Sequence, residues 1–159
     1  MMRALLSCLV AAALLAGCST DFWDMDPEMR IALPPGQATA LRVDRIEIRS
    51  SYYDPPDAFS EAFIPAFQSQ TDACARGQSP VRAVVFIHAL DRGGTLLDDQ
   101  GQARLSGSVD LIDARGRVIG RYPLSAQMPG PAGDLGERRS ALGEALGAQL
   151  CREAFAAGS

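Results

Sequence analysis

The stretch VRAVVFIHAL, residues 81–90, decides the fold of this chain. Only Arg82 and His88 interrupt its apolar run, which is the length of one strand. A run this apolar is typical of a central strand that is covered on much of both faces. The sequence therefore predicts a sheet with residues 81–90 in its interior.

Two further strands are predicted after this stretch, at residues 103–113 and 117–125. The short connection between them ends in Gly116, and glycine accepts the positive φ that a tight hairpin turn needs. An antiparallel hairpin is therefore expected. The side chains predicted to line it are Val109, Leu111, Val118 and Tyr122.

Another strand and a helix are predicted before the central strand. Residues 40–49 alternate as a strand does, but the phase changes near Asp44, which a β-bulge would explain. Residues 58–76 have a helical pattern that Gly77 would end. Pro65 leaves two possibilities: the main helix begins there, or the helix kinks there. The apolar stripe of this helix would hold Phe63, Phe67 and Cys74.

The last helix is predicted to begin at Asp134, with Glu137 three residues later in the pattern of a capping box. Its apolar residues recur every fourth position and define a buried face. That face would comprise Leu142, Leu146, Leu150 and Ala154. Small residues that would allow close approach of a neighbour are Ala141, Ala145, Gly147 and Ala148.

The expected order is therefore β-α-β-β-β-α. This order predicts an α+β fold: a four-stranded, mainly antiparallel sheet with two helices on one face. We assign these elements to a single domain over residues 40–159, a size sufficient for a hydrophobic core.

The first residues have the pattern of a secretory signal. Arg3 precedes an apolar run from Ala4 to Leu15, which is too short to span a membrane as a helix. Small residues then lead to Cys18 in the sequence Leu15-Ala16-Gly17-Cys18. The alternatives are an ordinary secretory signal with an incidental cysteine, or a buried apolar helix.

The segment Leu15-Ala16-Gly17-Cys18, with the run before it, resembles the lipobox of bacterial lipoproteins. The resemblance implies that residues 1–17 are removed and that Cys18 receives a diacylglycerol and then an acyl chain. Several acyl chains hold a protein firmly on a membrane. Ser19 follows in place of the aspartate that retains enterobacterial lipoproteins in the inner membrane. The resemblance therefore favours the outer membrane, with the domain in the periplasm and the inner membrane as the alternative.

The predicted signal also sorts the four cysteines. Cys8 leaves with the signal and Cys18 is the lipid site, which leaves Cys74 and Cys151 in an oxidising compartment. A disulfide between these two is expected. The alternatives are two buried free thiols or a metal site, and the single histidine makes metal binding the weaker of these.

Residues 18–39 are interpreted as the lipidated N-terminus and a tether, because acidic and apolar residues alternate there before Pro34 and Pro35. Trp23 suits a lipid headgroup zone, although a linker that packs partly on the domain is the alternative. Tyr52 and Tyr53 stand before two prolines in a predicted loop. This loop is a candidate partner contact or a turn whose rings pack on the domain.

Charge and motifs restrict the function. The formal charge is −4, and −5 once Arg3 is removed, so no basic surface for nucleic acid is expected. His88 is the only histidine and is interpreted as a structural residue. The sequence contains no nucleophile elbow and no phosphate-binding glycine loop before a helix. Catalytic residues, cofactors and metals are therefore not predicted.

In outline, the anchor, tether and small domain look like the accessory lipoproteins of lipopolysaccharide assembly and of ABC-type lipid transport. This resemblance of architecture implies a non-catalytic domain that binds an envelope protein or lipid. The alternatives are a carrier with an apolar groove between sheet and helices, and a cell-wall hydrolase.

Overall fold

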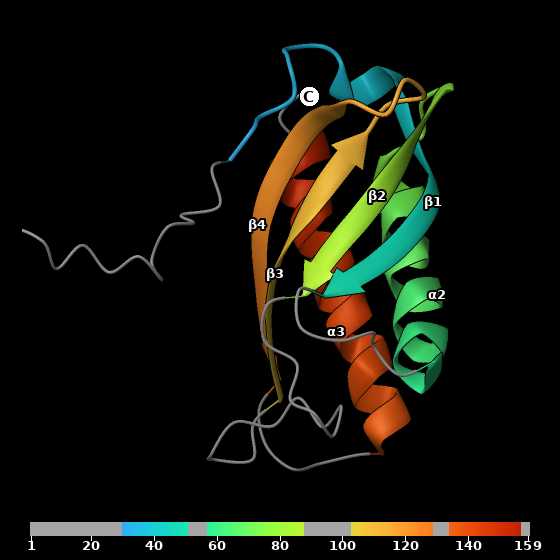
Figure 1. Cartoon of the computed structure of the whole chain (residues 1–159), viewed down its shortest axis with the longest axis vertical. Helices are drawn as coiled ribbons and strands as arrows, with labels where there is room; N and C mark the ends of the chain where they lie inside the picture. Colours follow the sequence, from blue (N-terminus) through green and yellow to red (C-terminus); the bar gives the residue numbers. More distant parts are fainter. Residues whose placement is uncertain (1–29, 51–56, 88–102, 129–133, 157–159) are drawn as a thin grey trace, which may run out of the picture.

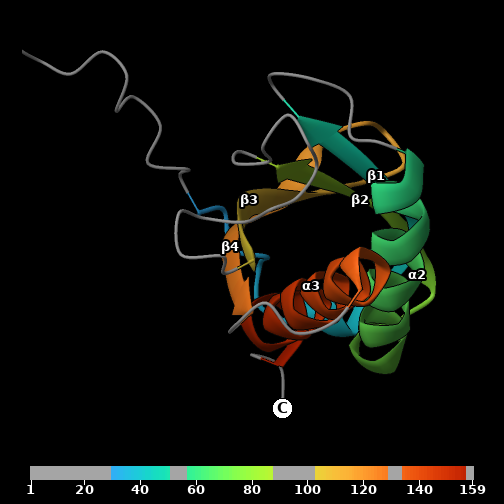
Figure 2. The same ribbon diagram turned by 90° about the horizontal axis from the view of Figure 1, so that it is seen from below.

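The structure is a computed structural model that describes residues 30–50, 57–87, 103–128 and 134–156. One four-stranded sheet, in the order β1-β2-β3-β4, has two long helices on one of its faces (Figures 1 and 2). This arrangement confirms the predicted α+β fold and the predicted order of elements. The elements are the 3₁₀-helix η1 (Ala38–Ala40), β1 (Leu41–Ser50), α2 (Asp57–Cys74), β2 (Ser79–Ile87), β3 (Ala103–Ile112), β4 (Val118–Met128), α3 (Leu135–Leu150) and the π-helical segment η2 (Cys151–Phe155).

The sheet is mainly antiparallel. β1 and β2 are parallel and are joined through α2, whereas β3 pairs antiparallel with both β2 and β4. The register of β1 shifts between Val43 and Arg45, so the predicted bulge at Asp44 is confirmed. The bulge returns Ile46 to the face of the sheet that carries Val43, and both side chains are buried.

The core lies between the sheet and the helices. The face of α3 predicted from the four-residue spacing is buried throughout, from Leu142 to Ala154. Opposite it, alternate residues of the strands point toward the helices, as Val85 and Val109 do. Val84 is also fully buried although it is on the other face of β2. The continuous apolar run at residues 81–87 therefore belongs to a central strand, as predicted.

The two helices approach each other closely. Phe59, Phe63 and Phe67 stack along the buried side of α2, with ring centroids 5.2 and 5.7 Å apart. A Cβ atom on Gly143 would lie 2.5 Å from the carbonyl oxygen of Phe63, and one on Gly147 would lie 2.7 Å from Cβ of Gln70. Glycine is therefore required at both positions of α3. Close approach at Gly147 was predicted from the sequence, whereas close approach at Gly143 was not.

Three local predictions are corrected. The helix does not begin at Pro65, because α2 runs from Asp57 to Cys74 with Pro65 inside it. Asp134 occupies the N-cap position of α3, but its side chain makes no capping hydrogen bond. Val118 does not line the hairpin core; it is 38% exposed because the register of β3 and β4 shifts between Leu111 and Ile112.

The predicted hairpin turn is confirmed. Gly116 has a φ of 78°, and its backbone N–H donates to the carbonyl of Asp113 over 2.9 Å. The Asp113 carboxylate also accepts from the backbone N–H groups of Arg115 and Arg117, at 2.9 and 3.0 Å. These hydrogen bonds satisfy backbone groups that, in the turn, have no partner on a neighbouring strand.

Candidate functional site

Cys74 and Cys151 form a disulfide bond, with their Cα atoms 5.8 Å apart. Cys74 ends α2 and Cys151 follows α3, so the bond joins the two helices at the end of the domain where residue 30 also lies (Figure 1). We use the name Arg30 end for this part of the surface: residues 30–40, 75–80, 113–118 and 151–156.

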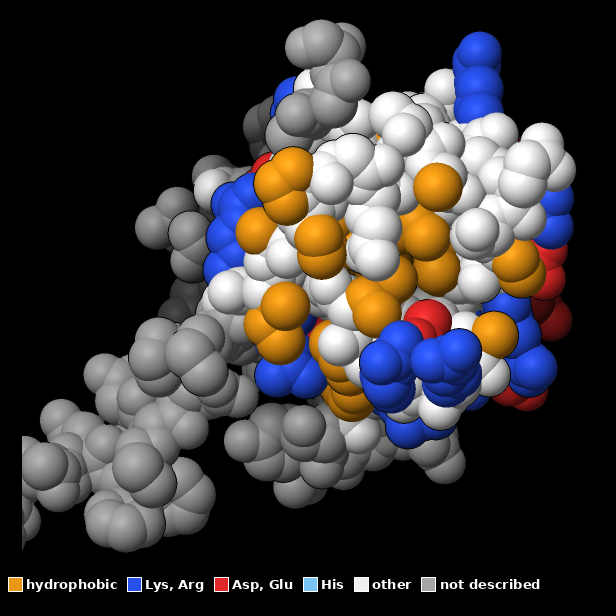
Figure 3. All heavy atoms as spheres, turned by 90° about the horizontal axis from the view of Figure 1, so that it is seen from above, with side chains coloured by type: hydrophobic (Ala, Val, Ile, Leu, Met, Phe, Trp, Pro, Cys, Tyr) orange, Lys and Arg blue, Asp and Glu red, His pale blue; other side chains and the backbone are white. Residues whose placement is uncertain are grey.

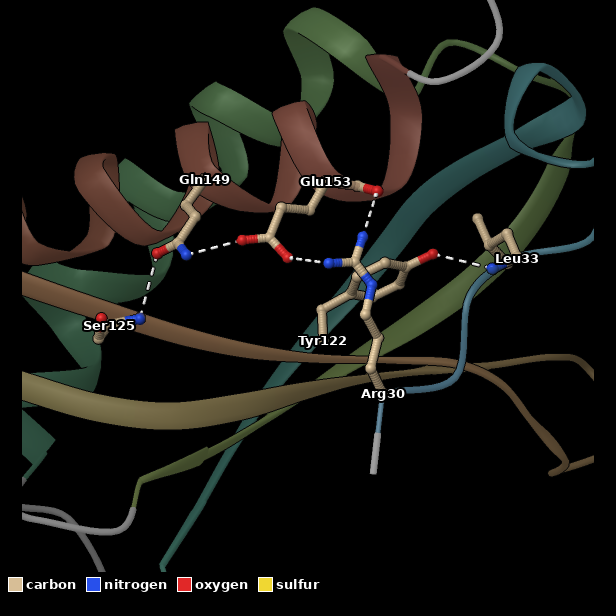
Figure 4. A network of polar contacts seen from close by, with 6 residues as sticks. All are labelled: Arg30, Leu33, Tyr122, Ser125, Gln149 and Glu153. Carbon is tan, nitrogen blue, oxygen red and sulfur yellow. Dashed lines mark hydrogen bonds and ion pairs between the residues drawn. The ribbon is translucent and has the colours of Figure 1, made fainter. Parts of the chain in front are cut away.

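Residues 30–40 lie against the domain through what we name the Arg30 network (Figure 4). The Arg30 guanidinium donates to the Glu153 carboxylate over 3.0 Å and to the Glu153 carbonyl over 3.3 Å. Its central carbon also lies 5.3 Å from the centre of the Tyr122 ring, within cation–π range. One arginine thus links the incoming chain to both β4 and η2.

The Arg30 network continues along the buried side of the incoming chain. The Tyr122 hydroxyl accepts the backbone N–H of Leu33 over 3.0 Å. Ile31 and Arg121 exchange two backbone hydrogen bonds, at 2.9 and 2.8 Å, so residue 31 extends the edge of β4. Ala38 is part of the hydrophobic core, with 8% of its surface exposed. The final ten residues of the predicted tether are therefore held on the domain.

Gln149 connects the same network to the lower part of β4. Its amide nitrogen donates to Glu153 over 2.8 Å, and its amide oxygen accepts from the backbone N–H of Ser125 over 3.1 Å. The Glu153 carboxylate thus accepts hydrogen bonds from both Gln149 and Arg30, which fixes its position beside Arg30.

A second charged group lies on the face of the sheet away from the helices. Arg82, Arg49 and Arg45 approach the Glu47 carboxylate to 3.1, 3.2 and 3.3 Å, and we name these four residues the Glu47 cluster. Partial burial raises the pKa of Glu47, but hydrogen bonds and positive charge, first from Arg82, outweigh it and hold the pKa below its usual value. The cluster keeps an excess of positive charge that can attract an anionic group.

In the strand register, a row of facing residues runs from Glu47 across the whole sheet. Glu47 is opposite Val84, Val84 is opposite Asp110, and Asp110 is opposite Arg121. Arg121 holds the Asp110 carboxylate by two hydrogen bonds of 2.6 Å each, and Asp110 is only 3% exposed. A buried carboxylate needs such a forked partner, so this pair is a structural part of the face.

One hollow adjoins the bulge in β1. Its volume is about 210 Å³, and Arg45, Pro80, Ile112 and Ala114 are among the residues that line it. Pockets for drug-sized ligands are larger, roughly 300–1,000 Å³. The hollow therefore suits a small group or a side chain of a partner better than a separate ligand.

Within the described residues, the space between sheet and helices is filled with side chains. Phe63, Phe67, Leu142 and Leu146 are at most 1% exposed there. This packing argues against the carrier hypothesis, which needs an open apolar groove at this interface.

Several of the candidate site residues predicted from the sequence cannot be placed in the structure. Cys18, Trp23, Tyr52, Tyr53 and His88 lie outside the described residues, so their assigned roles remain predictions. In the described ranges, no three His, Cys, Asp or Glu side chains gather in a way that could hold a metal ion. No helix in these ranges combines the length and apolar character that a membrane span requires.

The Arg30 network was missed by the sequence analysis. Arg30 and Glu153 are 123 positions apart, and neither belongs to a periodic pattern. Tyr122 was expected only to line the hairpin. A signal was present in its position, since a buried tyrosine hydroxyl requires a polar partner.

No family profile matches the sequence, and no curated protein is similar to it. Among solved structures, the fold is similar to that of a PelC dodecamer from Paraburkholderia phytofirmans, with 9% identity, a TM-score of 0.45 and coverage of 79% of this chain and 96% of that chain. A Xanthomonas campestris protein of the family DUF330 gives 9% identity, a TM-score of 0.45 and coverage of 76% and 87%. A provisionally assigned lipoprotein from Caulobacter crescentus gives 14% identity, a TM-score of 0.37 and coverage of 67% and 82%. These likenesses concern the fold.

Proposed function

We propose that this chain is a lipoprotein of the bacterial envelope whose α+β domain binds an envelope partner without catalysing a reaction. The observation that carries the proposal is the segment Leu15-Ala16-Gly17-Cys18 at the end of a short apolar run. In this proposal Cys18 bears the lipids, residues 1–17 are removed, and the domain lies in the periplasm at the outer membrane.

The structure supports this proposal in two ways. The disulfide between Cys74 and Cys151 suits an oxidising compartment such as the periplasm. The sheet face away from the helices carries the Glu47 cluster, whose side chains Arg45 and Arg49 are 73% and 56% exposed. Exposed arginines beside apolar strand residues are typical of protein contact surfaces.

The anchor is tested by the substitution Cys18→Ser, with Cys8→Ser as the matched control inside the same signal. Cells that express each variant are fed a palmitate analogue, and their membranes are separated. The C8S variant should take up the label and remain with membranes, whereas C18S should lose both properties. Membrane retention of unlabelled C18S protein would refute the lipid anchor.

The membrane is tested by the substitution Ser19→Asp in an enterobacterial host. If the position after Cys18 sorts this lipoprotein, the wild-type chain should sediment with the outer membrane and S19D with the inner membrane. A wild-type chain found in the inner membrane would refute the outer-membrane assignment and leave the anchor in place.

The partner is sought with a photoreactive residue at Arg49, in the Glu47 cluster, and with one at Ala73, on the exposed surface of α2, as the control. The proposal expects a crosslinked envelope protein or lipid from position 49 that is absent from position 73. Identical products from both positions would refute the sheet face as the binding surface.

A further inference from the structure

The Arg30 end carries exposed apolar side chains. Three large apolar side chains in the described residues are exposed, and two of them, Ile31 at 39% and Val118 at 38%, lie at this end. Pro34, Pro35 and Pro80, which belong to the same end, are also exposed. Figure 3, which looks onto this end, shows hydrophobic side chains gathered on the surface with arginines around them.

Positive charge surrounds this apolar surface. Arg76, Arg115 and Arg152 are exposed, and none of them forms a salt bridge with another described residue. They come from three different segments: the connection between α2 and β2, the hairpin turn and η2.

The carboxylates at the Arg30 end are occupied by other groups. Asp113 and Glu153 are paired with Arg117 and Arg30, and Asp44, outside this end but bordering the same hollow as Pro80, is paired with Arg42. Asp72, near the end of α2, accepts a hydrogen bond of 2.6 Å from Gln68. The three arginines are therefore left to face an external anion.

The Arg30 network fixes where the chain reaches the domain. Arg30 is held by Glu153 and Tyr122, and it stands twelve positions after Cys18. Twelve residues span at most about 40 Å even when fully extended. A lipid anchor at Cys18 therefore limits how far the Arg30 end can move from the membrane.

We infer that the Arg30 end is a membrane-docking surface for anionic phospholipid headgroups. This inference rests on the lipid anchor of the proposed function. Arg76, Arg115 and Arg152 would bind headgroup phosphates, which guanidinium groups hold through paired hydrogen bonds. Ile31, Val118 and the prolines would lie at the boundary of the headgroups and the acyl chains.

The test uses the full lipidated chain in vesicles of phosphatidylethanolamine with phosphatidylglycerol, and in vesicles of phosphatidylcholine alone. A fluorophore is attached to a new cysteine at Ala114 in the hairpin turn, or at Glu137 at the opposite end of the domain. Lipids that carry a nitroxide quencher report contact. In anionic vesicles the label at position 114 should be quenched several-fold more than the label at position 137.

The arginines are tested by R76Q/R115Q/R152Q, with R49Q, near the far end of β1, as the control. An arginine near an anionic surface strengthens contact about fivefold. The triple variant should therefore lower quenching at position 114 to its level in phosphatidylcholine, while the control should not. All four side chains are exposed, so neither variant should prevent folding.

Each failure has its own signature. A chain that does not float with the vesicles refutes the lipid anchor and, with it, the docking surface. A chain that floats with equal quenching at positions 114 and 137 overturns the docking surface alone. Shielding of position 114 from water without quenching by lipid would show that a second copy of the chain covers this end, and would also overturn the inference.

Discussion

Two glycines of α3 determine how closely it packs on α2. The substitution Gly143→Ala places a methyl group 2.5 Å from the backbone oxygen of Phe63, which cannot move without moving α2. Overpacking of this kind costs about 1–3 kcal/mol, and better helix propensity returns about 1 kcal/mol. We expect a net loss of up to about 2 kcal/mol in the free energy of unfolding, measured with urea.

Gly136→Ala is the matched control for that substitution in the same helix. A Cβ atom there meets only the Asp134 carboxylate oxygen, at 3.1 Å, and that side chain can rotate away. The control should leave stability unchanged or slightly raised. A loss as large as that of G143A would show that the close helix contact is not the cause.

Tyr122 makes the residue-scale contact that holds the incoming chain. The substitution Tyr122→Phe keeps the ring beside Arg30 but removes the acceptor for the Leu33 N–H. We expect a loss of about 1 kcal/mol in stability and much faster hydrogen exchange at the Leu33 amide. Arg30→Gln, which removes an exposed ion pair, should cost less than about 1 kcal/mol. An unchanged Leu33 exchange rate in Y122F would contradict this role.

The burial of residues that recur at a regular spacing could be predicted from the sequence. The roles of residues whose partner is distant in the chain could not. Leu142, Leu146 and Leu150 recur at helical spacing, so their burial could be read directly. Gly143 appears in the sequence only as a poor helix former, because its reason, the backbone of α2, is 80 positions away. The contact between Arg30 and Glu153 could not be predicted from the sequence for the same reason.

The stability of the β3–β4 turn should depend on pH in the acid range. The backbone N–H of Arg117 lowers the pKa of Asp113, and the Arg117 side chain and the Arg115 N–H lower it further. A lowered pKa in the folded state means that the carboxylate stabilises the fold fully above the ordinary aspartate pKa. That stabilisation disappears as the pH falls through the lowered value.

The substitution Asp113→Asn tests this dependence. The wild-type chain should be more stable than D113N at pH 7, and the difference should shrink as the pH falls below about 4. Urea unfolding of both chains at several pH values measures it. A difference that stays constant from pH 7 to pH 2 would show that the charge of Asp113 does not contribute.

At the scale of elements, the sequence predicted more of the strands than of the helix ends. Alternation at residues 40–49 was clear enough to locate even the bulge at Asp44. The end of α3 was not predicted, because the four-residue spacing of apolar residues continues from Leu150 to Ala154 and does not mark the change to the π-helical segment η2.

For the whole molecule, the disulfide is the largest single constraint on the unfolded chain. It closes a loop across a sequence separation of 77, which in the chain-entropy model stabilises the fold by about 4 kcal/mol. The variant C74A/C151A should lose about that much in urea unfolding. A reducing agent should bring the wild-type chain to the same value and leave the variant unchanged; sensitivity of the variant would point to another thiol.

The fold class and the order of elements could be predicted from the sequence, but the strand order and the surface could not. Apolar periodicity shows which faces of the elements are buried, and these faces place both helices on one side of the sheet. The Arg30 end is formed by four segments far apart in the chain, so its mixture of apolar and arginine side chains has no counterpart in any local stretch.

The position of the Arg30 network has a mechanical consequence. A pull on an anchor at Cys18 would reach the domain at Arg30 and Ile31, whose partners are in η2 and on the edge of β4. From there the disulfide passes the load to α2, which is joined to β1 and β2. The force is therefore distributed over the whole domain at one end, and β1 cannot be peeled from the sheet until the Arg30 network has broken.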